Sequence, residues 1–123
     1  MDYVIDPDQV EAWPLHPEVM GKILVDGQNM TAMVCEWAPK STFALHSHPH
    51  EQLGYCLRGE AVVTIDGQDH RIGQGQLYYV PSNAPHAWRN DGDDPALLID
   101  VYSPVRDDLL RRRFEQKVVE TSL

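Results

Sequence analysis

Short runs of β-forming residues, each bounded by turn-forming residues, follow one another from residue 22 to residue 102, and they constrain the fold more than any other feature. Strands are predicted over 22–25, 30–37, 43–48, 54–57, 61–65, 77–80, 86–89 and 96–102. Asp26-Gly27 and Asp66-Gly67 are two-residue hairpin signals between such runs. Many short strands with one late helix indicate an all-β barrel or jelly roll.

The length of 123 residues predicts a single domain. Residues 1–19 contain three prolines, which disfavour a continuous helix and predict an extended N-terminal arm. The arm's Trp13 and Leu15 need an apolar cover, which either a neighbouring subunit or the barrel itself could supply. Residues 20–103 are predicted to form the barrel, and residues 104–123 a C-terminal helix and tail.

The predicted C-terminal helix has a capping residue, Ser103, and a proline suited to its first turn. Leu110, Phe114 and Val118 recur at four-residue spacing and would form its buried stripe.

The charge balance is acidic, since 19 Asp and Glu against 10 Lys and Arg give a formal net charge of −9. Without a basic cluster, we expect no nucleic-acid partner. No apolar run approaches membrane-spanning length and the first residues lack a signal-peptide pattern, so we expect no membrane partner. Cys35 and Cys56 lack metal-type spacing and are expected to be buried, reduced thiols. A cytoplasmic location is therefore expected.

Two separated stretches carry histidines in a pattern that predicts a metal site. His46 and His48 are alternate residues, and in an extended strand their side chains leave the same face. An isolated pair of this kind is more often an exposed strand than a metal site. A second stretch, residues 75–90, favours the metal interpretation, because it places His86 on a strand after a Pro/Asn/Pro turn.

Together these stretches resemble the two motifs of the cupin superfamily, whose RmlC-like members are double-stranded β-helix jelly-roll barrels. The first motif reads G-x5-H-x-H-x(3,4)-E-x6-G, and the second reads G-x5-P-x-G-x2-H-x3-N. The residues that match are His46, His48, Gln52 and Gly59 in the first, and Gly75, Pro81, His86 and Asn90 in the second.

The resemblance implies one divalent transition metal, Zn, Ni, Mn or Fe, bound by His46, His48, Gln52 and His86. The sequence departs from the motifs at Lys40 and Asn83, where glycines are expected, and at Gln52, which replaces glutamate. A neutral amide ligand would leave more positive charge on the ion and make it a stronger Lewis acid. His50 follows a proline and is expected at the mouth of the site rather than among the ligands.

The predicted strand at 96–102 carries one unexplained carboxylate. Alternation places Asp100 on an apolar face with Leu98 and Tyr102. An ionised carboxylate in an apolar interior costs several kcal/mol unless it is paired or used. Asp100 therefore either forms a salt bridge with Arg106 or Arg89, or lines the metal cavity as a general acid or base.

The residues from Asp100 to Arg106 resemble the D-x-(F/Y)-S-P-x-R ending of small single-domain cupins of pectin and alginate breakdown. Those cupins help to convert 4,5-unsaturated monouronates to open-chain keto forms. The resemblance implies that Asp100, Tyr102 and Arg106 line the active site, and a planar guanidinium suits a uronate carboxylate.

Three functions remain open: a metal-dependent isomerase of a small organic acid such as an unsaturated uronate, an iron-dependent dioxygenase of a small organic substrate, and a non-catalytic cupin that binds a small molecule. A carboxylate in the cavity favours an enzyme over a module that only binds acids. The arm and the open strand edges predict a homodimer.

Overall fold

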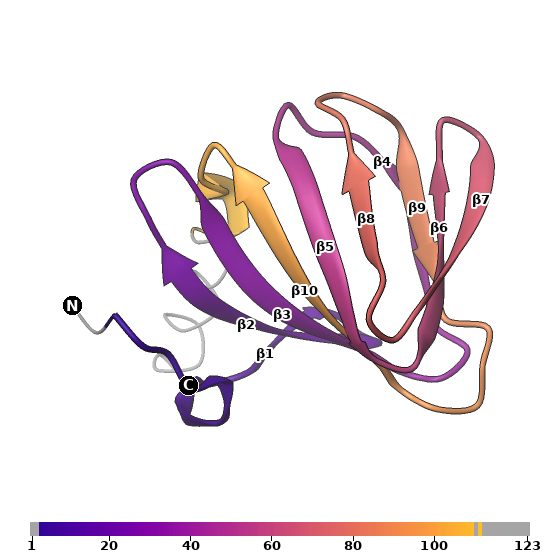
Figure 1. Cartoon of the computed structure of the whole chain (residues 1–123), viewed down its shortest axis with the longest axis horizontal. Coiled ribbons are helices and arrows are strands. Elements are labelled where there is room, and N and C mark those ends of the chain that lie inside the picture. The colour runs from indigo at the N-terminus through magenta and orange to yellow at the C-terminus, as the bar shows by residue number, and fades with distance from the viewer. Residues whose placement is uncertain (1–2, 110, 112–123) are drawn as a thin grey trace.

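Two antiparallel sheets form the protein in a computed structural model, which describes residues 3–109 and 111 (Figure 1). The six-stranded sheet has the order β1-β2-β3-β10-β5-β8, and the four-stranded sheet has the order β4-β9-β6-β7. A short 3₁₀ turn, η1 (Pro7–Gln9), precedes the strands. The strands are β1 (Trp13–His16), β2 (Val19–Asp26), β3 (Thr31–Trp37), β4 (Thr42–His46), β5 (Glu51–Arg58), β6 (Glu60–Ile65), β7 (Gln68–Gly73), β8 (Leu77–Val80), β9 (His86–Arg89) and β10 (Ala96–Ser103). The predicted all-β jelly-roll barrel is confirmed.

Strand β10 lies between β3 and β5 and shows the predicted alternation. Leu98, Asp100 and Tyr102 are buried, whereas the residues between them, which face the other side of the sheet, are partly exposed. Leu98 belongs to the apolar core between the two sheets, so the carboxyl group of Asp100 also lies on the inner side.

Two strands of the structure, β1 and β7, were not predicted from the sequence. β1 forms within residues 1–19 and pairs with β2, so that Trp13 is only 6% exposed and Leu15 packs against the core. The barrel of the same chain therefore covers this part of the arm. β7 is an edge strand in which Ile72 is the one buried residue, so its sequence has no apolar alternation to reveal it.

The two Asp-Gly pairs form different turns. Asp66 and Gly67 join β6 to β7 with φ angles of 49° and 82°, as a two-residue hairpin requires. The prediction for Asp26-Gly27 is wrong, because the loop after β2 runs from Gly27 to Met30 and Gly27 does not have a positive φ. The backbone N–H of Gly27 donates to the Met30 carbonyl at 2.9 Å, which closes this longer loop.

Lys40 and Asn83, which stand where the cupin motifs have glycine, have φ angles of 62° and 65°. The backbone therefore keeps the left-handed conformation that favours glycine, and these two departures from the motifs leave the turns in place.

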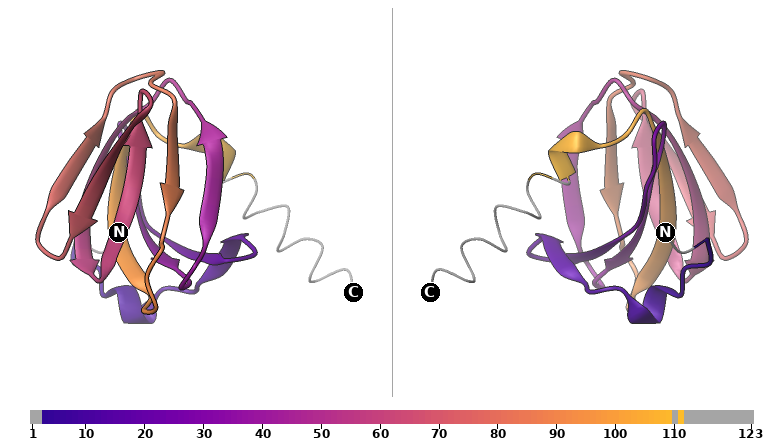
Figure 2. Two further views of the ribbon diagram at one scale, coloured as in Figure 1. Left: turned by 90° about the vertical axis from the view of Figure 1, so that its right-hand side faces the viewer. Right: turned by 90° about the vertical axis from the view of Figure 1, so that its left-hand side faces the viewer.

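Residues 107–109 are helical and lie at the opposite end of the barrel from η1 (Figures 1 and 2). The predicted cap at Ser103 is wrong, because Ser103 ends β10, its hydroxyl donates to the Asn29 carbonyl at 2.8 Å, and residues 104–106 are not helical. The predicted stripe of Leu110, Phe114 and Val118 lies outside the described residues. Among the residues that the structure describes, no helix is long and apolar enough to cross a membrane. Cys35 and Cys56 are buried free thiols, as expected.

Candidate metal centre and its cavity

Three histidines from different parts of the chain meet inside the barrel. His46 ends β4, His86 begins β9, and His48 precedes β5. The ring centroids of His46 and His86 are 4.2 Å apart, and those of His48 and His86 are 4.8 Å apart. One nitrogen of each ring lies within 4.8 Å of the corresponding atoms of the other two. The structure thus brings together the three histidines of the two sequence stretches.

The backbone orients all three rings in the same way. In each ring Nδ1 lies 2.8–3.0 Å from the carbonyl oxygen of a residue two positions away. A carbonyl can only accept, so each Nδ1 carries the hydrogen and each Nε2 presents a lone pair. Burial lowers the pKa of His46 and His86, and it lowers the pKa of His48 to about 4. The imidazoles are therefore neutral near pH 7, as metal ligands must be.

Two of these lone pairs lack a protein donor. His86 Nε2 is buried without a hydrogen-bond partner among the described residues. His48 Nε2 lies 3.1 Å from Gln52 Oε1, so two acceptors face each other. A cation bound by both His48 Nε2 and Gln52 Oε1 would satisfy the two atoms. Two ligand atoms that each lie about 2.1 Å from one ion, at right angles to each other, are about 3 Å apart, which matches the separation of these atoms. The donor set fits a divalent metal.

Two hydrogen bonds fix the orientation of the Gln52 side-chain amide. Its Nε2 donates to the Tyr78 hydroxyl at 3.0 Å and to Asp100 Oδ1 at 3.2 Å, which turns Oε1 toward His48. A Cβ atom on Gly54 would lie 1.9 Å from the Tyr78 ring, so only glycine leaves room for the ring there. Tyr78 was not predicted as a site residue. Alternation along β8 could have marked it as inward-facing, but not as a partner of Gln52.

A cavity of about 290 Å³ opens beside the histidines. Three aromatic residues, Trp37, Phe43 and Trp88, contribute to its wall. Its polar lining includes His46, His48, Gln52, Asp100, Tyr102 and Arg106, which the sequence had assigned to the ligand set or the active site. His50 is not among the lining residues, and its Nε2 lies 3.1 Å from the Val105 carbonyl oxygen. A larger hollow, about 650 Å³, lies near η1, and none of the histidines lines it.

Asp100 is 3% exposed, and the amide of Gln52 donates to its carboxyl group. Burial raises the pKa of Asp100 to about 7, although the Gln52 hydrogen bond and the charge of Arg106 act in the opposite direction. Neither predicted salt bridge occurs among the described residues, because Arg106 pairs with Asp108 and Arg89 pairs with Asp69 and Asp91. A carboxyl group that titrates near neutral pH can both accept and donate a proton.

Arg106 lies at the cavity wall with its guanidinium carbon 4.6 Å from the centroid of the Tyr102 ring. Its Nε and Nη2 donate to the two carboxylate oxygens of Asp108 at 2.9 and 2.8 Å. Asp108 was not predicted as a site residue. Asp107 and Asp108 both follow Arg106 in the sequence, and their spacing does not show which of them pairs with the arginine.

The sequence comparisons agree with this geometry. Residues 33–102, more than half of the chain, match the Cupin_2 family, the cupin domain. The chain belongs to the cupin family. This cupin is also 27% identical to the pectin degradation protein KdgF of Dickeya dadantii over 109 residues, a match that covers 88% of this chain and 97% of that protein.

Other relatives match a smaller part of larger proteins. The HTH-type transcriptional regulator PuuR of Escherichia coli is 35% identical over 46% of this chain and 31% of the regulator. Quercetin 2,3-dioxygenase of Bacillus subtilis is 33% identical over 63% of this chain and 23% of the dioxygenase. The cupin therefore spans about a third or less of these two proteins.

Solved structures share the fold. KdgF from a Halomonas species superposes with a TM-score of 0.81 at 24% identity, covering 89% of this chain and 99% of that chain. An RmlC-like cupin from Shewanella frigidimarina also gives a TM-score of 0.81, at 23% identity, covering 89% of this chain and 96% of that chain. At such low identity the likeness extends to the fold only.

Proposed function

We propose that this cupin is a metal-dependent isomerase of a small sugar acid, such as a 4,5-unsaturated monouronate. The observation that supports this most is the placement of Asp100, a buried carboxyl group joined by one hydrogen bond to the amide that faces His48. Arg106, which suits a carboxylate, lines the same cavity. The similarity to KdgF over most of both chains supports the same substrate class.

His46, His48, Gln52 and His86 would hold one divalent transition metal, with Zn, Ni, Mn and Fe all compatible with three imidazoles and an amide oxygen. When bound, the ion would supply Lewis acidity to a substrate oxygen near Asp100.

Asp100 would move the proton in this reaction. It accepts the proton of the anomeric hydroxyl as the bond between C1 and the ring oxygen breaks, which leaves an aldehyde at C1 and an enolate at C5. It then delivers this proton to C4, which gives the 5-keto acid with no net change in composition. Burial raises the pKa of Asp100, which favours the return of the proton as well as its uptake.

The other residues would bind and orient the acid. Arg106 holds the substrate carboxylate. The Tyr102 ring stacks against the guanidinium and forms part of the cavity wall. The aromatic residues that line the rest of the cavity exclude water from the reacting atoms.

The test follows the loss of the conjugated enol absorbance of 4,5-unsaturated galacturonate. Asp100→Asn should retain the metal and the fold but lose about 10²–10⁴ in rate, as expected for removal of a general acid or base. Asp26→Asn, which removes an exposed carboxylate, is the control. A wild-type rate equal to the spontaneous rate would exclude the uronate substrate.

A second candidate function is an iron-dependent dioxygenase of a small organic substrate, which the partial match to quercetin 2,3-dioxygenase favours. Uptake of O₂ with a phenolic or diketone substrate, together with an inactive uronate assay, would select this function. Ligand binding without turnover in either assay would select a non-catalytic cupin.

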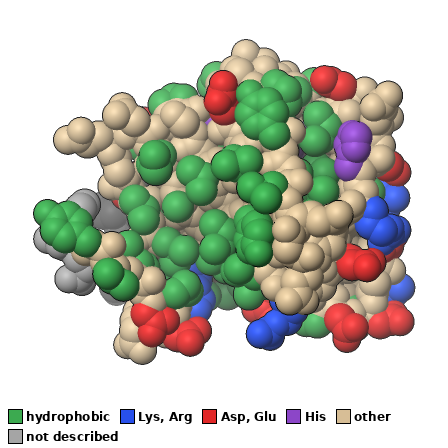
Figure 3. Space-filling view, in the orientation of Figure 1, with side chains coloured by type: hydrophobic (Ala, Val, Ile, Leu, Met, Phe, Trp, Pro, Cys, Tyr) green, Lys and Arg blue, Asp and Glu red, His purple; other side chains and the backbone are tan. Residues whose placement is uncertain are grey.

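We also propose that the cupin pairs as a homodimer, through the outer face of the six-stranded sheet. Leu53 faces Tyr79 and Tyr55 faces Leu77 across β5 and β8, and all four are 40–59% exposed. Apolar side chains gather on this side of the molecule (Figure 3). Exposed patches of this kind mark contact surfaces.

The size of this face suits a second copy of the chain. Five adjacent strands from β2 to β8, spaced about 4.8 Å apart and about seven residues long, present on the order of 500 Å² of flat area. Each partner of a standard interface buries about 800 Å² of accessible surface, which a corrugated face of this extent approaches. Of the two predicted reasons for pairing, a cover for Trp13 does not apply, because Trp13 is buried within its own chain. The open strand edges were the other reason.

Sedimentation tests the dimer. The wild type should sediment at twice the chain mass of 14.0 kDa, and Leu53→Glu should sediment as a monomer. Leu45→Glu is the matched control, since Leu45 is 66% exposed but lies on the four-stranded sheet. A wild-type monomer at micromolar concentration would contradict the proposal.

A further inference from the structure

Arg106 is fixed in place at the cavity wall by three separate features. Its backbone N–H donates to the buried Thr31 hydroxyl at 2.8 Å, its guanidinium stacks on Tyr102, and its side chain is only 11% exposed. A guanidinium held in this way keeps its position whether or not a ligand is present. Such a buried cation also requires an anionic partner.

Asp108 is that partner in this structure, and it binds as a free carboxylate would. Its two oxygens accept from Nε and Nη2 of Arg106 at 2.9 and 2.8 Å, the two-pronged geometry of arginine with a carboxylate ligand. Arg106 in turn holds the pKa of Asp108 to about 2, so that the carboxylate remains charged at any neutral pH.

The two members of the pair differ in how easily they can move. The side chain of Asp108 is 56% exposed, whereas that of Arg106 is 11% exposed. Rotation of Asp108 into water breaks the ion pair and the weaker hydrogen bonds from the backbone of residues 108 and 109, but it exposes a carboxylate that is already half solvated. Asp108 also lines the cavity, so it occupies space that an incoming acid would use.

We propose that Asp108 is an internal competitor for the carboxylate site on Arg106, and that an acidic ligand binds by displacing it. The proposal rests on the proposed function only in taking a sugar acid as the ligand. A tethered carboxylate competes at an effective concentration of roughly millimolar or above. A simple anion gains only the ion pair and is excluded, whereas a sugar acid gains further contacts in the cavity and displaces Asp108.

Asp108 is thus a positioning and selectivity residue rather than a catalytic one. It sets how much binding energy beyond the carboxylate contact a ligand must provide. Because the effect is a competition, removing the competitor should strengthen the binding of every carboxylate and leave the binding of neutral sugars unchanged.

The experiment measures binding by calorimetry or NMR titration, without turnover, using D-galacturonate, acetate and the neutral sugar D-galactose as probes. Asp108→Asn should bind galacturonate about tenfold more tightly than the wild type, and should gain acetate binding, with galactose unchanged. Asp107→Asn removes the same charge from the neighbouring exposed residue and should behave as the wild type. Asp108→Glu restores a tethered carboxylate and should return part of the competition.

The double variant Arg106→Gln, Asp108→Asn should lose the gain, because the gain requires the arginine that Asp108 releases. Thermal unfolding of each variant checks that the fold is intact. Galacturonate binding by Asp108→Asn that is no tighter than wild type, or undetectable in both, would overturn the proposal. An equal gain in galactose binding would also overturn it, since that would indicate a wider cavity rather than a freed arginine.

The outcome is separable from that of the isomerase test. If the wild type fails to convert the unsaturated uronate while Asp108→Asn gains affinity for acids, the competitor is supported and the reaction is wrong. If turnover occurs and Asp108→Asn loses affinity, the reaction stands and Asp108 instead supports Arg106.

Discussion

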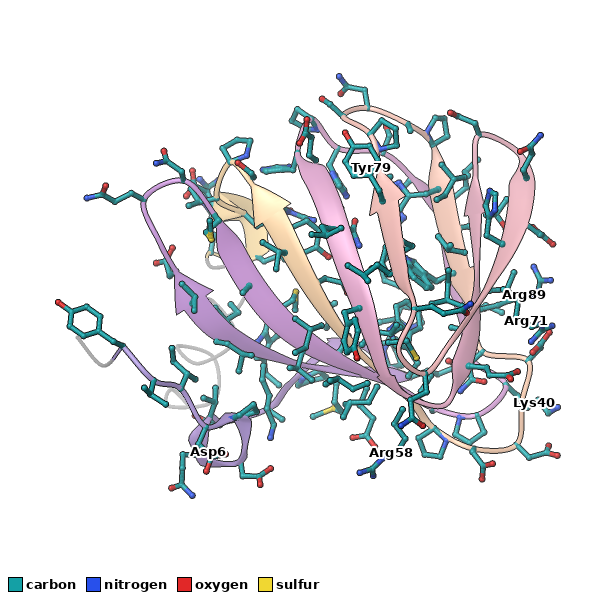
Figure 4. The ribbon with its side chains drawn as sticks, viewed as in Figure 1. Asp6, Lys40, Arg58, Arg71, Tyr79 and Arg89 are labelled. Carbon is teal, nitrogen blue, oxygen red and sulfur yellow. The ribbon has the colours of Figure 1, made fainter. Side chains whose placement is uncertain are left out.

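Charged and polar side chains behave differently on the outside of the four-stranded sheet and in the cavity. Outside, Arg71 pairs with Asp91 at 2.9 Å and Arg89 pairs with Asp69 at 3.0 Å, and all four side chains are at least 40% exposed. Arg71 and Arg89 lie close together at the edge of the molecule (Figure 4). Next to the cavity, by contrast, His86 Nε2 is buried beside His46 and His48 without a partner among the described residues.

The difference indicates where the protein needs a ligand. The outer pairs satisfy one another, and exposed pairs of this kind contribute little to stability because water and salt compete for both charges. The cavity groups are left with unused lone pairs or a buried carboxyl group, and a buried unsatisfied polar atom costs about 1–3 kcal/mol. The gathering of such acceptor atoms at one point favours a bound cation, which would satisfy them together.

The largest expected effect is loss of the metal from the cavity. His86→Ala and His48→Ala should each abolish stoichiometric binding of a divalent metal, because each removes one of the three imidazoles of the candidate site. Arg71→Gln, on the outer face, should leave the metal content unchanged. Metal analysis of protein purified without chelator or nickel resin gives the measurement.

Unchanged metal content in both histidine variants would mean that the ion lies elsewhere or is absent. Circular dichroism of each variant should show the wild-type β content, so that loss of metal is not mistaken for loss of fold.

The three histidines were predicted to meet because alternation and motif spacing each mark one stretch. Alternation predicted that His46 and His48 share a side, although β4 ends at His46 and His48 lies in the segment before β5, and the second motif predicted His86, which begins β9. Alternation also predicted the inward face of β10, including Asp100. Most of the strands were predicted because each is a short run of β-forming residues bounded by turn-forming residues.

Contacts between strands that are distant in the sequence could not be predicted in this way. Tyr78 reaches Gln52 only because β8 pairs with β5 and Gly54 leaves room for its ring. The turn of Asp108 toward Arg106 depends on the backbone after β10, which no periodicity describes. β7 has a single buried apolar residue, Ile72, so its pairing with β6 had no alternating apolar signature.

A smaller effect is expected where the cavity depends on tight packing. Gly54→Ala should destabilise the protein by about 1–3 kcal/mol, because the new methyl group would overlap the Tyr78 ring. Movement of that ring should also release Gln52 and weaken metal binding. Chemical denaturation and metal titration measure the two effects.

Gly73→Ala is the matched control on an edge strand. A Cβ atom there would lie 3.6 Å from its nearest neighbour, Gln76, an ordinary contact, and the backbone does not have a positive φ. Equal destabilisation by the two variants would show that the loss of glycine, rather than the Tyr78 contact, sets the effect.

The smallest expected effect is a difference between two ion pairs in acid. Hydrogen bonding to Arg106 holds the pKa of Asp108 to about 2, and hydrogen bonding to Arg71 lowers the pKa of Asp91. An aspartate in the unfolded chain has a pKa of about 3.9. Because both folded-state values are depressed, each pair stabilises the protein above about pH 4 and loses that contribution as the pH falls toward the folded-state pKa.

Salt should separate the two pairs, because it screens exposed charges more strongly than buried ones. Arg106 is 11% exposed and Arg71 is 53% exposed, so the Asp108 pair should persist in high salt and the Asp91 pair should not. Thermal unfolding between about pH 4 and about pH 2, in low and high salt, would compare Asp108→Asn and Asp91→Asn with the wild type. In high salt only Asp108→Asn should flatten the acid-induced loss of stability. If high salt removed the effects of Asp108→Asn and Asp91→Asn equally, the Arg106–Asp108 pair would behave like an exposed ion pair. The contrast between the cavity and the outer face would then not apply to this pair.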